Sequence, residues 1–172
     1  MRRRSTATTS SRATRLECAA DQAWAVAASG RRGPRWYVDA PPLLVRGAID
    51  RLLPGARPQS PLPDRDLLEV GDGAGFWKVT GADPVTRRLE LTAQVRAPGT
   101  VVITTVVEPD GAPGTAEPVD TEACWLRQEV RLSPRGLAGL AYLVVDLPAR
   151  ELVIELTHRR LVADVRRATQ IG

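Results

Sequence analysis

The sequence is poor in several residue types on which common functional sites depend. Cysteine occurs twice, histidine once and lysine once. Cys18 and Cys124 are too far apart for a metal knuckle, and a single histidine excludes a zinc site built from both residue types. His158 also belongs to no serine-hydrolase motif. The sequence therefore predicts no metal, no cofactor and two free, buried thiols.

Long apolar runs are absent as well. No stretch approaches the roughly 18 uninterrupted apolar residues that a membrane helix needs. The segment Met1–Arg15 contains arginines without an apolar stretch behind them, so it does not resemble a secretory signal. We therefore expect a cytoplasmic protein without membrane insertion.

The positive charge is concentrated near the N-terminus. The net charge is +4, and the first 15 residues alone contain five arginines, so the remainder is close to neutral. A nucleic-acid interface needs basic residues clustered on one face, and no such stripe is visible, so we predict no nucleic-acid partner. Residues 1–14 have the composition of a disordered basic arm, which leaves 15–172 as a single domain.

The apolar pattern changes along the chain from a helical period to a strand period. Two short helices are predicted first, one around Trp24 that ends at Gly30 and one over 41–53 that opens with two prolines. Alternation then predicts strands over 67–70, 76–80, 89–95, 100–108 and 124–132, besides a short one at 15–18. Turn residues between them indicate hairpins, and hence an antiparallel sheet.

A long helix is predicted to follow, from Leu137 to Arg167, with Pro148 kinking or splitting it. The sheet must bury its apolar face, and this helix is the element large enough to cover it. The predicted class is therefore α+β, with a curved antiparallel sheet wrapped around the C-terminal helix.

One stripe of this helix contains two polar residues. The apolar members of the stripe are Leu140, Leu143, Val144, Leu147, Ile154, Leu161, Val162 and Val165. Glu151 and His158 lie in the same stripe, roughly 10 Å apart along the axis, too far for a direct hydrogen bond. Either they line a cavity and hold the polar end of a ligand, or they lie at a solvated edge or form a satisfied core pair.

Four further residues are candidates for a ligand site. Trp36, Tyr37 and Trp77 either face a ligand or pack in the core, and Gln128 lies on the buried face of its strand. Gln128 and Tyr37 are also the neighbours that could satisfy Glu151 or His158.

Several short motifs resemble a bacterial family of uncharacterised domains, DUF2867. They are Arg46–Leu52, Val70–Asp72 with Phe76–Val79, Pro98-Gly99 with Val107–Gly111, and Pro134–Tyr142. The order of elements is similar to the helix-grip plan of the START-like superfamily, which includes plant allergens, lipid-transfer domains and polyketide cyclases. The chain departs from the family pattern at Val38–Ala40 and at Ala149–Glu151, where aromatics are usual.

This resemblance implies binding of a hydrophobic small molecule, such as a lipid, polyketide or isoprenoid, between sheet and helix. Two alternatives remain open: an enzyme of the cyclase or dehydratase type that uses Glu151 or His158, and a structural or interaction domain. Members of the family are sometimes fused to a Rossmann domain, so a homodimer or a separate Rossmann-type partner protein also stays open. The resemblance supplies no catalytic residues.

Overall fold

A computed structural model of the chain describes residues 8–31, 35–40, 63–94, 99–111, 122–134 and 136–170. Its elements, in chain order, are β1 Thr8–Leu16, α1 Ala20–Ala27, α2 Trp36–Asp39, β2 Gly73–Ala74, β3 Trp77–Asp83, β4 Arg88–Ala93, β5 Gly99–Pro109, β6 Cys124–Pro134 and α4 Gly136–Thr169. The helix predicted over 41–53 lies outside the described residues.

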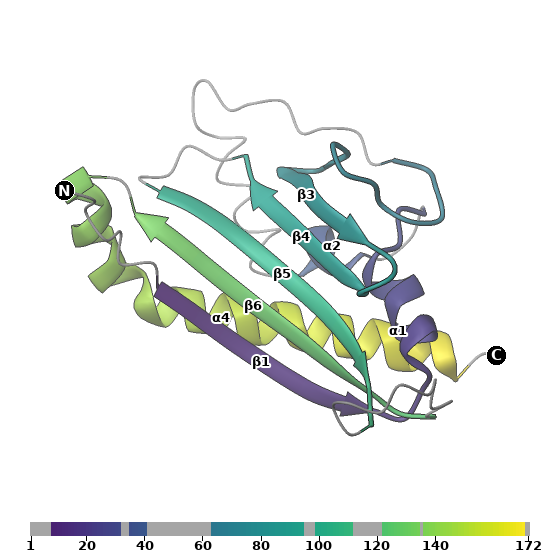
Figure 1. The fold of residues 1–172 in the computed structure, drawn as a ribbon. Helices are drawn as coiled ribbons and strands as arrows, with labels where there is room; N and C mark the ends of the chain where they lie inside the picture. Colours follow the sequence, from purple (N-terminus) through teal and green to yellow (C-terminus); the bar gives the residue numbers. More distant parts are fainter. Residues whose placement is uncertain are drawn as a thin grey trace.

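The strands form one antiparallel sheet of six, in the order β1-β6-β5-β4-β3-β2. Helix α4 lies across one face of this sheet, beneath β1, β6 and β5, and α1 packs near its C-terminal end (Figure 1). The helix-grip plan predicted from the order of elements is therefore confirmed. The face of the sheet that α4 covers is called the inner face below.

The N-terminal strand corrects the prediction of a disordered arm. Residues 8–14 belong to β1, which pairs with β6 along its whole length, from Thr8 opposite Leu132 to Leu16 opposite Cys124. Ser10, Arg12 and Thr14 alternate inward from this edge strand. Their polarity hid the alternation, because an inward-facing row is normally apolar.

Leu67–Val70 is not a strand. Leu67 makes a single antiparallel bridge with Ser29, and Gly71 then turns the chain with a φ of 99°. Glycine adopts this left-handed conformation without steric cost, so the turn requires it. The predicted strand is therefore wrong, although the predicted turn is present.

Alternation correctly located the inner face of the long strands. Leu89 and Leu91 of β4 are buried, as are Leu126, Gln128 and Val130 of β6. On α4, the four members of the predicted stripe whose side chains are described, Ile154, Leu161, Val162 and Val165, are all buried against this face. The side chains of the other four, Leu140, Leu143, Val144 and Leu147, lie outside the described residues.

Helix α4 is continuous through Pro148 over its 34 residues. Its first part is turned away from the axis of the remainder (Figure 1). Proline removes one helical hydrogen bond and crowds the preceding turn, which bends a helix more often than it ends one in a packed context. Within the ranges given above, no helix is both long and apolar enough to span a membrane.

Two leucines of α4 test this packing. Leu161 is fully buried, whereas Leu152 is 57% exposed on the same helix. We expect Leu161→Ala to lower the free energy of unfolding by about 2–5 kcal/mol, because it removes buried methyl groups and leaves a cavity. Leu152→Ala is the matched control and should change it by less than about 0.5 kcal/mol. Urea unfolding measures both, and equal effects would contradict the described orientation of α4.

Candidate functional site

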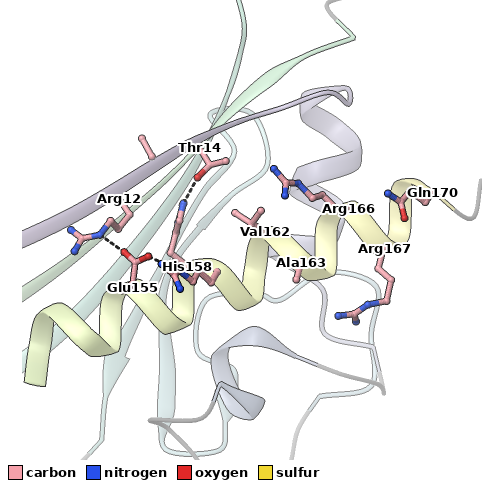
Figure 2. Close-up of a pocket in the computed structure, with 11 residues that line it drawn as sticks. Arg12, Thr14, Glu155, His158, Val162, Ala163, Arg166, Arg167 and Gln170 are labelled. Carbon is pink, nitrogen blue, oxygen red and sulfur yellow. Dashed lines mark hydrogen bonds and ion pairs between the residues drawn. The ribbon is translucent and has the colours of Figure 1, made fainter.

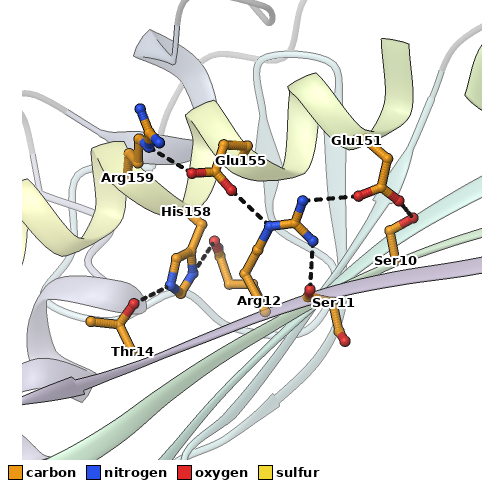
Figure 3. Close-up of polar contacts among 9 residues, drawn as sticks. Ser10, Ser11, Arg12, Thr14, Glu151, Glu155, His158 and Arg159 are labelled. Carbon is orange, nitrogen blue, oxygen red and sulfur yellow. Dashed lines mark hydrogen bonds and ion pairs between the residues drawn. The ribbon is translucent and has the colours of Figure 1, made fainter. Parts of the chain in front are cut away.

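A buried row of polar side chains crosses the inner face of the sheet and ends at α4. Gln128 of β6 donates from Nε2 to Thr105 Oγ1 of β5 (3.1 Å), and its Oε1 lies 3.3 Å from His158 Nδ1. The other ring nitrogen, Nε2, lies 2.8 Å from Thr14 Oγ1 of β1 (Figure 3). This polar row therefore links three strands through one imidazole.

The row determines the tautomer of His158. Gln128 Oε1 can only accept a hydrogen bond, so Nδ1 carries the proton. In the neutral ring Nε2 then accepts from the Thr14 hydroxyl. Burial lowers the pKa of His158, and Arg12 lowers it further, while Glu155 opposes both. The neutral imidazole is thus favoured, and its basic nitrogen faces the edge strand.

Beside this row, Arg12 joins β1 to two carboxylates of α4. Its Nε donates to Glu155 Oε2 (2.7 Å) and its Nη2 to Glu151 Oε2 (2.9 Å) (Figure 3). Glu155 also accepts from Arg159 Nε (2.6 Å), and Ser10 donates to Glu151. The hydrogen bond from Arg12, followed by that from Arg159, lowers the pKa of Glu155. The Glu155 carboxylate is therefore held ionised, and both carboxylates are tied to the edge strand through Arg12.

An open groove of about 670 Å³ runs between β1 and the C-terminal half of α4. We call it the β1–α4 groove (Figure 2). It is lined by Arg12, Ala13 and Thr14 of β1, by Glu155, His158, Arg159, Val162, Ala163, Arg166 and Arg167 of α4, and by Gln170. His158 is the point where the polar row meets the groove.

The structure brings together some of the residues singled out from the sequence. His158 and Gln128 are in contact, and both are buried. Glu151 does not share their environment: its side chain is 46% exposed and paired with Arg12. Of the alternatives left open for Glu151, the position at a solvated edge agrees with this exposure, because at that turn α4 contacts the edge strand β1.

Trp36, Tyr37 and Trp77 are core residues that do not line the β1–α4 groove. The Trp36 indole donates to Ala27 O (2.9 Å), and the Trp77 indole donates to Tyr37 O (2.8 Å). Tyr37 donates its hydroxyl to Ser29 O (2.6 Å), and burial raises its pKa to about 12. These bonds fix α1, α2 and β3 to one another.

The sequence interpretation missed Arg12, Thr14 and Glu155. Two signals point to them: the alternation Ser10, Arg12, Thr14, and the spacing of Glu151, Glu155 and His158 by one helical turn each. The polar side chains of the strand and those of the helix face each other and satisfy each other's hydrogen-bonding groups. Within the described part of the chain, no three His, Cys, Asp or Glu side chains are grouped to hold a metal ion.

Comparison with known families decides the classification. The family model described as protein of unknown function (DUF2867) matches residues 4–157. The chain belongs to this family. No curated protein matches the sequence.

Solved structures resemble the chain at the level of its fold. An aromatase/cyclase (Zhui) from a Streptomyces species is 14% identical, with a TM-score of 0.49, covering 95% of this chain and 96% of that one. Norcoclaurine synthase from Thalictrum flavum is 14% identical, with a TM-score of 0.47, covering 91% and 92%. The di-domain ARO/CYC protein BexL is 13% identical, with a TM-score of 0.47 over 95% of this chain, which spans 46% of BexL. At this level of similarity, the ligands and reactions of these proteins are not transferred to the chain.

The lowered pKa of His158 predicts how stability depends on pH. The pKa of His158 is lower in the folded protein than its ordinary value of about 6.5. At a pH between these two values, His158 binds a proton in the unfolded chain but not in the folded protein. The free energy of unfolding should therefore fall as the pH falls from about 7 through the folded pKa. Urea unfolding across this range measures the slope.

His158→Gln is the matched variant, because His158 is the chain's one histidine. The variant should be less stable at pH 7, since the polar row is disturbed, and its stability should depend less on pH above about 5.5, where ordinary carboxylates stay ionised. An unchanged slope would show that His158 is not protected from protonation.

Proposed function

We propose that this protein binds a hydrophobic small molecule, of lipid, polyketide or isoprenoid type, between its sheet and α4. The observation that carries the proposal is the β1–α4 groove, whose volume of about 670 Å³ lies in the range of small-molecule sites. It lies between β1, an edge strand of the sheet, and the C-terminal half of α4.

The lining of the groove suits a ligand with an apolar body and a polar group. Val162 and Ala163 supply apolar surface from the α4 wall of the groove. His158 and Arg12 are fixed in place by the polar row and by the carboxylates, so they present polar atoms at defined positions. A mostly fixed set of polar groups beside apolar surface orients a ligand at low entropic cost.

An enzyme of the cyclase or dehydratase type is the second candidate, and the state of His158 favours it. A neutral imidazole with its Nδ1 proton held by Gln128 has Nε2 available as a base. Nε2 is within 2.8 Å of the Thr14 hydroxyl at the groove, so a substrate group that displaces this hydroxyl would meet the base.

Filling the groove tests the binding proposal. Ala163 lines it, whereas Ala168 is exposed on the same helix and does not. We expect Ala163→Trp to weaken binding of the neutral fluorophore N-phenylnaphthylamine at least about tenfold, a loss of about 1.4 kcal/mol. Ala168→Trp should leave binding unchanged. Equal binding by both variants would place the ligand elsewhere.

The mass of a co-purified ligand distinguishes binder from enzyme. Native mass spectrometry of wild-type protein and of His158→Gln, each purified from the protein's own host, should show the same ligand if no reaction occurs. A dehydratase, or a cyclase whose ring closure includes loss of water, would instead leave the variant with a precursor heavier by one water, because the base that starts the elimination is missing. An empty wild-type protein would count against both candidates.

A further inference from the structure

The β1–α4 groove has an uneven distribution of charge. Four of its lining residues are arginines, Arg12, Arg159, Arg166 and Arg167, and one is a carboxylate, Glu155. Near His158 the charges balance, since Arg12 and Arg159 are paired with Glu155, and Arg12 also with Glu151. The excess of positive charge therefore lies toward the last turns of α4.

At that end, the two arginines differ in their partners. Arg167 donates to Asp164 (3.0 Å), a carboxylate that also accepts from Arg160 (3.2 Å). The Arg166 guanidinium makes no hydrogen bond or ion pair with any residue that the structure describes. Figure 2 shows Arg166 on the β1 side of α4 and Arg167 turned the other way. All the donors of Arg166 are thus available to a ligand in the groove.

We infer that the groove recognises the acidic group, a carboxylate or a phosphate, of an amphipathic ligand, and that Arg166 binds this group. The inference rests on the proposed function and adds the chemical class of the ligand. A guanidinium binds either acid through two parallel hydrogen bonds, and Gln170 supplies a further donor beside it.

The dimensions of the groove fit such a molecule. His158 and Arg166 are eight residues apart on one helix, which corresponds to roughly 12 Å along the axis. Val162 and Ala163 lie between them and line the groove. The acidic group would lie at Arg166, the apolar body along Val162, and the far end of the ligand beside His158.

Another role for Arg166 needs no ligand. Arg166 and Arg167 lie in the last turn of α4, where a positive charge interacts favourably with the partial negative charge of a helix C-terminus. That role predicts an effect of Arg166 on stability alone. Ligand recognition predicts a preference for acids that disappears without Arg166.

The test compares decanoate with decanol, two probes with the same chain and different head groups, by isothermal titration below their micelle concentrations. Wild-type protein should bind decanoate at least about tenfold more tightly than decanol, and added salt should weaken decanoate binding selectively. Arg166→Gln should abolish this preference while decanol binding persists. Decyl phosphate in place of decanoate shows which acid the site prefers.

Arg131→Gln is the matched control, since it removes the same charge from an exposed residue on the opposite face of the sheet. It should retain the preference for decanoate. Equal binding of decanoate and decanol, or a preference unchanged in Arg166→Gln, would overturn the inference but leave the proposed function intact. If neither probe binds and the neutral fluorophore does not bind either, the proposed function fails as well.

Discussion

The contact between β1 and α4 is the constraint on which the site depends. β1 is an edge strand, and it turns Ser10, Arg12 and Thr14 toward the helix, where the other strands turn mostly apolar residues. Unpaired polar groups in such an interface cost a few kcal/mol, so α4 has to present complementary groups at the same spacing. Glu151, Glu155 and His158 do so, one helical turn apart, toward Ser10, Arg12 and Thr14.

Because of this complementarity, the described polar groups are paired at one end of the groove and only partly paired at the other. Around His158 the polar side chains hydrogen-bond to one another and are held in place. This end of the groove therefore suits the orientation of a ligand or a proton transfer more than the attraction of a charged group. Around Arg166 there is charge without a partner among the described residues. Between the two ends lie apolar residues of α4, of which Val162 is buried and Ala163 is exposed.

The sequence predicted those parts of the fold in which burial and polarity agree. The buried positions of β4 and β6 and of the α4 stripe from Ile154 to Val165 are mostly apolar, and they were located correctly. β1 was missed because its inward residues are Ser, Arg and Thr. The environment of Glu151 stayed open, because helical period gives a direction around the axis but not the distance to the edge of the sheet. The groove was not predictable, since it depends on how far β1 and α4 diverge.

The sheet pairs β1 with β6, the first strand in the sequence with the last. During synthesis β1 is made before the other described strands. Its neighbour β6 is the last of them, and the polar groups of α4 that contact β1 come later still. Contacts so distant in sequence form slowly. An edge strand rich in serine, threonine and arginine is a poor template for pairing with another chain, whereas an exposed apolar edge strand favours such pairing.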